Sequence, residues 1–140
     1  MNADKRTREE RPLAPEERKR INALTRRIIR AAHDVSNALG CGFLEKVYEN
    51  ALAHELRKAG LKVLQQHPVR VFYDGVVVGD YVADLLVEDS VLVELKAAKG
   101  LDETHLAQCL NYLRATGLRV CLLINFGRPR LGVKRIVREF

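Results

Sequence analysis

The spacing of apolar residues changes near residue 60, and this change limits the fold more than any other feature of the chain. Between residues 15 and 59 apolar side chains recur every three or four positions, which predicts one helix over 15–40 and another over about 44–59. The residues expected on the buried faces of these helices are Ile21, Leu24, Ile28, Val35, Leu39, Leu44, Val47, Ala51 and Leu52.

After residue 60, runs of Val, Tyr and Phe broken by short turn sequences are typical of strands. The expected strands are 62–66, 69–73, 76–87 with an interruption at Gly79, 91–96, 120–124 and 134–138, and a third helix is expected over 103–115. A chain of 140 residues is long enough for one compact core and too short for two ordinary domains. The sequence therefore predicts a single domain over 14–140, preceded by a flexible basic arm over 1–13.

The net charge of +6 is concentrated in the first 30 residues, which carry ten Lys and Arg against five Asp and Glu. Clustered basic charge attracts polyanions, so nucleic acid is the expected partner, although an ordinary solvated helix face explains the charge equally well. The sequence shows neither a membrane-spanning apolar stretch nor an apolar leader, which predicts a cytoplasmic protein without a membrane partner. The three cysteines form no C-x-x-C pair, so a zinc site is not indicated.

Two carboxylates are expected to face each other across a hairpin. If residues 88–90 form the loop between two antiparallel strands, residue 87 pairs with 91 and Asp84 lies opposite Glu94. Strand alternation places Lys96 on the same face as Glu94. Two facing carboxylates are costly unless one is protonated or a cation lies between them, and hard oxygen ligands suit Mg²⁺ or Mn²⁺.

Lys96 could then activate a metal-associated water and balance the charge that gathers on a phosphate. The alternative is an exposed sheet face on which Lys96 relieves the repulsion through an ion pair. Other residues could complete such a site. Glu45 or Glu49 on the second helix could supply a third acid, and Gln108 with Tyr112 could hold a phosphate or stack on a base, unless they are ordinary surface and packing residues. A second basic cluster, Arg128, Arg130, Lys134 and Arg135, could contact phosphates or simply be solvated.

The order of these motifs resembles the PD-(D/E)XK nuclease superfamily. The run Glu94-x-Lys96 follows Asp84, with Ala83 at the position of the proline in the superfamily name, and Gln108-x-x-x-Tyr112 resembles the auxiliary motif of RecB-type nucleases. More narrowly, the segment 42–48 resembles the signature of the GxxExxY protein family, with Gly42, Glu45 and Tyr48 in the named places. The runs 81–87 and 123–127 are also similar to that family, and the resemblance spans roughly residues 28–137.

The resemblance implies an α/β fold, with a mixed central β-sheet flanked by helices in a restriction-endonuclease-like core. It also implies a Mg²⁺-dependent nuclease (or Mn²⁺-dependent), with DNA the favoured substrate and a homodimer compatible with the sequence. The implied metal ligands are Asp84, Glu94 and Glu45, which is preferred over Glu49; Lys96 is the implied catalytic lysine, and Gln108, Tyr112 and Tyr48 are the substrate-binding residues. The alternative is a catalytically silent nucleic-acid-binding or regulatory module with the same fold. A third, weaker interpretation is a protein-interaction domain whose acidic patch docks a basic partner.

Overall fold

The computed structural model describes residues 11–140, in which three helices enclose one five-stranded sheet. The elements follow one another as α1 (Pro15–Leu39), α2 (Glu45–Lys58), β1 (Val63–Tyr73), β2 (Val76–Val87), β3 (Val91–Lys96), α3 (Glu103–Thr116), β4 (Val120–Asn125) and β5 (Gly132–Val137). The basic arm expected over 1–13 therefore lies mostly outside the described residues.

The sheet is mixed. Its strands lie in the order β1-β2-β3-β4-β5, and only β3 and β4 run parallel to each other. A parallel pair needs a long crossover, which α3 supplies, whereas the antiparallel pairs are joined by short turns. The expected α/β fold with a mixed central sheet is confirmed.

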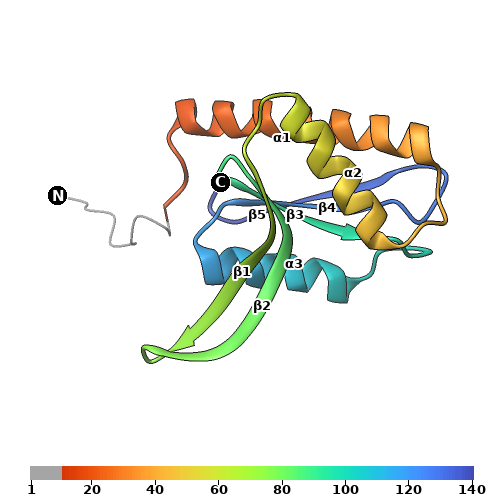
Figure 1. Ribbon diagram of the computed structural model, residues 1–140. Helices are drawn as coiled ribbons and strands as arrows, with labels where there is room; N and C mark the ends of the chain where they lie inside the picture. The colour runs from red at the N-terminus through yellow and green to blue at the C-terminus, as the bar shows by residue number, and fades with distance from the viewer. Residues whose placement is uncertain (1–10) are drawn as a thin grey trace.

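Helices cover both faces of the sheet: α1 and α2 lie on one face and α3 lies on the other (Figure 1). Each face has its own apolar core. Along β4, Val120, Leu122 and Ile124 belong to the core under α1 and α2, and Cys121 and Leu123 belong to the core under α3. This alternation confirms the expected strand over 120–124 and shows that it is covered on both faces.

Helix α1 has the predicted bounds. Pro15 occupies its first position, and Gly40 follows its last residue with a φ of 69°, in the region that favours glycine. The predicted buried face is correct for Ile21, Leu24, Ile28 and Val35, which are all buried, and Leu39 packs partly against the same core.

The buried face predicted for α2 was correct for Leu52 and wrong for Leu44 and Val47. Leu44 is 80% exposed and Val47 is also exposed, whereas Tyr48, Leu52 and Leu56 are fully buried. Relative to the predicted orientation, the helix is rotated about its axis by about one residue, because the aromatic ring of Tyr48 enters the core. The loss of contact for two aliphatic side chains is offset by the larger apolar area of that ring.

Strands β1 and β2 form one continuous hairpin, where the sequence predicted two short strands and an interruption at Gly79. Strand β1 continues through Pro68 because it is an edge strand, and an edge strand tolerates a residue without an N–H donor. The distal half of the hairpin projects away from the helices (Figure 1). Several of its large apolar side chains are exposed, namely Phe72, Tyr73, Val76, Val77, Val78, Tyr81 and Val82.

Candidate active site

The predicted hairpin register is confirmed as far as the pair Leu85–Val93, next to the two carboxylates. Val87 pairs with Val91, and the loop 88–90 is a tight turn in which Ser90 N donates to Val87 O at 3.0 Å. Glu88 and Asp89 both have positive φ angles, 51° and 54°, which suit a turn that joins twisted antiparallel strands.

Asp84 and Glu94 lie where β2 and β3 separate. The last regular pair is Leu85 with Val93, and one step further each carboxylate bonds to the backbone of the other strand. Asp84 N donates to Glu94 Oε1 at 2.9 Å, and Leu95 N donates to Asp84 Oδ2 at 2.8 Å. The two side chains are therefore held side by side, and one oxygen of each remains for a further ligand.

Burial makes this pair electrostatically unfavourable. Glu94 is only 3% exposed, and its burial together with the charge of Asp84 raises its pKa to about 8. Burial also raises the pKa of Asp84, against the lowering effect of the hydrogen bond from Leu95, and the charges of Glu49 and Glu45 raise it further. A cation between the two carboxylates would remove this cost.

Lys96 lies two residues beyond Glu94 on β3, beside Asn125 of the parallel strand β4. Among residues 11–140, the ion pairs within 4 Å include none from Lys96 to Asp84 or Glu94. The structure therefore does not show the ion pair on which the alternative interpretation depended.

Sequence reasoning did not find the loop contact that follows Lys96. Asn125 Oδ1 accepts from Ala98 N at 3.0 Å and from Gly127 N at 2.9 Å, and Asn125 Nδ2 donates to Ala98 O at 3.0 Å. A Cβ at Gly127 would lie 2.3 Å from the backbone of Ala98, so only glycine fits there. This contact fixes the course of the chain directly after Lys96.

Gln66 is a second residue that the sequence did not reveal. It lies opposite Asp84 on β1, where regular pairing is missing, and its backbone has a left-handed φ of 55°. Its side-chain amide donates to Glu49 Oε1 at 2.7 Å and approaches Asp84 Oδ1 at 3.5 Å. Left-handed backbone at a residue with a side chain costs energy and is often found at functional sites.

The two candidate helix acids differ in their surroundings. Glu49 is buried, and both of its oxygens are occupied by hydrogen bonds from Gln65, Gln66 and Lys46. Glu45 is exposed at the first position of α2, and its charge acts on both Asp84 and Glu94. Glu45 therefore has a carboxylate available for a metal ion, whereas Glu49 orients Gln66.

Tyr48 has a structural position, which corrects its assignment as a substrate-binding residue. Its ring is fully buried and stacks on Phe126, with ring centroids 4.7 Å apart. Its hydroxyl donates to Gly40 O at 2.6 Å and accepts from Phe43 N at 3.2 Å. Tyr48 thus fixes the loop between α1 and α2. Glu45 is the first residue after this loop.

Replacing Tyr48 by Phe is expected to lower the free energy of unfolding by about 1 kcal/mol, because the ring contact remains and only the hydroxyl contacts are lost. Thermal unfolding followed by circular dichroism measures this change. Tyr73→Phe, at an exposed tyrosine of the hairpin, is the matched control and should leave stability unchanged. Equal stability of the two variants would contradict a role for the Tyr48 hydroxyl in holding the loop.

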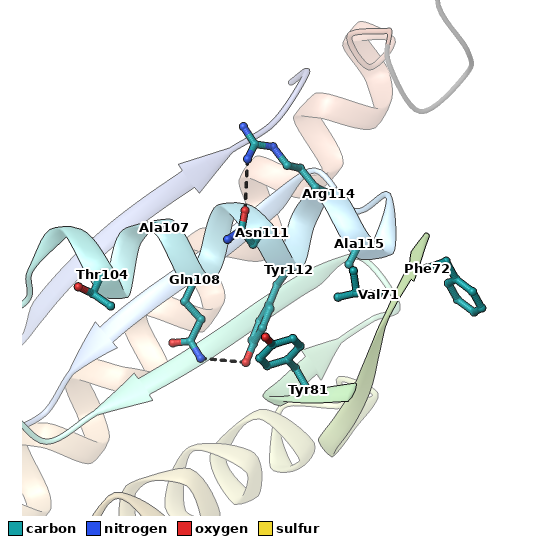
Figure 2. A pocket seen from close by; sticks show the side chains of 10 residues that line it. All are labelled: Val71, Phe72, Tyr81, Thr104, Ala107, Gln108, Asn111, Tyr112, Arg114 and Ala115. Atoms are coloured by element: carbon teal, nitrogen blue, oxygen red, sulfur yellow. Dashed lines mark hydrogen bonds between the residues drawn. The ribbon is translucent and has the colours of Figure 1, made fainter. Parts of the chain in front are cut away.

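The sequence left open whether Gln108 and Tyr112 bind substrate or are ordinary surface and packing residues, and Tyr112 has a packing position. It is only 5% exposed and packs in the core under α3. Gln108 Nε2 donates to the Tyr112 hydroxyl at 2.9 Å, as Figure 2 shows. Burial and the nearby charge of Glu94 raise the pKa of Tyr112 to about 12, so its hydroxyl keeps its proton at neutral pH.

The acid set fits a hard divalent cation with incomplete protein coordination. Within residues 11–140 no group of three or more His, Cys, Asp and Glu side chains is arranged as a ready-made metal cage. Mg²⁺ does not require one, because it keeps several waters and commonly binds one or two carboxylates. Asp84 and Glu94, each with one oxygen fixed by a backbone N–H, meet that requirement.

The remaining basic residues are spread over different elements. Arg128 and Arg130 are exposed in the loop after β4, whereas Arg135 bonds to Asn22 and its guanidinium lies over the ring of Phe140. Among the described helices, none is both long enough and apolar enough to cross a lipid bilayer.

Comparison with known proteins identifies the class to which this fold and site belong. The model of the PD-(D/E)XK nuclease superfamily matches residues 22–136, and the chain belongs to that superfamily. The fold is also similar to that of an alkaline exonuclease (LHK-Exo) from Laribacter hongkongensis, with a TM-score of 0.51 and 16% sequence identity over 66% of this chain. The similar region is 55% of that exonuclease, so this chain spans about half its length. No curated protein matches the sequence.

Proposed function

We propose that this protein is a Mg²⁺-dependent nuclease, also served by Mn²⁺, that hydrolyses phosphodiester bonds of nucleic acid, with DNA the favoured substrate. The observation that carries the proposal is the pair of hydrogen bonds, from Asp84 N to Glu94 and from Leu95 N to Asp84, that fixes a buried and a partly buried carboxylate side by side. Membership of the superfamily supports the same reaction class. The narrower assignment to the GxxExxY family is part of the proposal and rests on Gly42, Glu45 and Tyr48.

In this proposal Asp84, Glu94 and Glu45 hold the metal ion. When bound, the ion supplies a Lewis acid that activates water and polarises the phosphate. The backbone N–H groups of Asp84 and Leu95 orient the two carboxylates before substrate arrives, so little reorganisation is needed. Gln66 and Glu49 keep Asp84 in place from the side of α2.

Lys96 provides the positive charge of the site. On the same strand face as Glu94, its ammonium group would orient the attacking water and stabilise negative charge developing on the phosphate. Gln108 and Tyr112 contribute neutral hydrogen-bond donors to the phosphate or sugar. The tyrosine remains protonated at neutral pH, so it can donate such a bond.

The basic surface of α1 supports nucleic acid as the substrate. Its exposed basic residues are Lys19, Arg20, Arg26, Arg27 and Arg30. Positive charge in this density attracts a phosphodiester backbone and makes binding weaken at high salt.

The test is cleavage by the purified protein of single-stranded DNA, double-stranded DNA and RNA, each with Mg²⁺, with Mn²⁺ and with chelator. We expect cleavage with either metal ion, loss of cleavage with chelator and recovery when excess metal is restored. Calorimetric titration with Mn²⁺ should show binding in the absence of nucleic acid. Cleavage that persists in chelator would contradict the metal-dependent mechanism, and the absence of both Mn²⁺ binding and cleavage would favour the silent binding module.

A further inference from the structure

A groove runs between the projecting β1–β2 hairpin and α3. Its volume is about 910 Å³, and Figure 2 shows the side chains that line it. Its walls are largely apolar and aromatic, and its polar groups come from α3; the residues that matter here are Val71, Tyr81, Gln108, Asn111, Tyr112 and Arg114. No carboxylate is among its lining residues within the described chain, and its charged group is the guanidinium of Arg114.

The groove shares Gln108 and Tyr112 with the proposed substrate-binding residues. Tyr112 lines the groove, bonds to Gln108, and lies within electrostatic reach of Glu94 and Asp84. Tyr81 precedes Asp84 by three residues on β2, which corresponds to roughly 10 Å along a strand. Stacked nucleotides of one strand are spaced by roughly 3.4 Å, so a few nucleotides can span from Tyr81 to the carboxylates.

Tyr81 has the properties of a stacking platform. It is 52% exposed although it lies on a strand, and its ring leans on Tyr112 with centroids 5.9 Å apart and an angle of 50° between the planes. The contact with Tyr112 restrains the ring, while the exposed part of it faces the groove (Figure 2). Aromatic side chains presented in this way bind bases by stacking with little sequence preference.

The polar lining complements the rest of a nucleotide. Asn111 and Gln108 carry amide groups that can bond to a base edge, and Arg114, which donates to Asn111 Oδ1 at 3.2 Å, can meet a phosphate. The combination of one aromatic platform, two amides and one cation therefore matches a nucleotide better than an apolar side chain of a protein partner.

We propose that this groove holds an unpaired nucleotide of the substrate, stacked on Tyr81, so that the enzyme acts on single-stranded nucleic acid or on unpaired ends. This inference rests on the proposed nuclease function and specifies its substrate class. A base inside a duplex has both faces covered by its neighbours, so it cannot stack on Tyr81 unless it leaves the helix. Blunt duplex should therefore be a poor ligand of the groove.

The experiment measures binding in the presence of chelator, so that it does not depend on catalysis. An oligodeoxynucleotide carrying 2-aminopurine reports stacking through quenching of its fluorescence, and anisotropy of an end label reports affinity. We expect the wild-type protein to quench the single-stranded probe and to bind it roughly tenfold or more tightly than Tyr81→Ala does. Tyr81→Trp should restore both signals, and blunt duplex should be bound more weakly without a change in quenching.

Tyr73→Ala is the matched control, because it removes an exposed aromatic ring from the same hairpin outside the groove lining. It should behave as wild type. Equal affinity and quenching for Tyr81→Ala and Tyr73→Ala would overturn the inference, and so would equal binding of blunt duplex. Failure of the proposed function is distinguishable, since it would appear as absent metal-dependent cleavage while Tyr81-dependent binding of single strands remains.

Discussion

Substitution of Asp84 by Asn is expected to abolish Mn²⁺ binding and to reduce cleavage by more than roughly 10³-fold, since the ligand charge that holds the ion is removed. The fold should be retained, because Asn has the same shape and its side-chain oxygen can still accept the hydrogen bond from Leu95 N. Metal-free Asp84→Asn should even be slightly more stable than wild type at pH 8, since it removes a buried charge from an unfavourable pair. Calorimetric titration, cleavage assays and thermal unfolding measure the three effects.

Lys96→Ala gives the complementary result. Because Lys96 is not a ligand in the proposed site, Mn²⁺ binding should persist while cleavage falls by roughly 10² to 10³-fold, the usual effect of removing one group that stabilises the transition state. Asp80→Asn and Lys99→Ala are matched controls, since Asp80 is an exposed acid on β2 and Lys99 an exposed lysine after β3. Full activity in Asp84→Asn, or a loss in the controls equal to that in the site variants, would refute the assignment.

The second large effect concerns pH. In the metal-free protein the pKa of Glu94 rises from its ordinary 4.5 to about 8, so between these values the folded chain holds a proton that the unfolded chain has released. Stability therefore falls as pH rises from about 4.5 to 8 and is level below that window. The corresponding upper limit on the loss of unfolding free energy is roughly 5 kcal/mol. We expect the melting temperature to drop by on the order of 10 °C between pH 5 and pH 8.

Glu94→Gln should remove most of this pH dependence, since the amide cannot ionise, and the variant should melt above wild type at pH 8 without metal. Asp34→Asn, at an exposed acid of α1, should keep the slope of the wild type. Saturating Mn²⁺ should raise the melting temperature of the wild type at pH 8, where the carboxylate is free to bind, more than at pH 5. An unchanged slope in Glu94→Gln would show that other groups control the pH dependence.

The sequence predicted the parts of this structure that depend on local pattern. Helical spacing located α1 to within one residue, and turn composition together with alternation predicted the register of β2 on β3 up to Leu85 and Val93, next to Asp84 and Glu94. Both features are set by interactions between neighbours in the chain or across a short loop. The roles of Asp84, Glu94, Lys96 and Glu45, and the dimer and cellular location expected from the sequence, stay predictions.

What the sequence did not predict depends on contacts between distant segments. Tyr48 was assigned to substrate through the family resemblance alone, yet its hydroxyl bonds to Gly40 and Phe43 and its ring stacks on Phe126. Gln66 has a left-handed backbone conformation, which the strand pattern of the sequence does not predict. Its side chain contacts Glu49 and Asp84, which lie on other elements. The spacing of apolar residues along the sequence does not predict such tertiary contacts.

The hydrogen bonds of Asp84 and Glu94 to the facing strands have a consequence for how this enzyme class can diversify. The two acids make hydrogen bonds between β2 and β3 where regular pairing ends. A residue that cannot accept these bonds would therefore change both the pairing of the strands and the chemistry of the site. Tyr81 and Glu45 are exposed and make no such hydrogen bond between strands. New substrate preferences are therefore expected to arise through changes at the hairpin and at the start of α2, while the acidic pair stays constant.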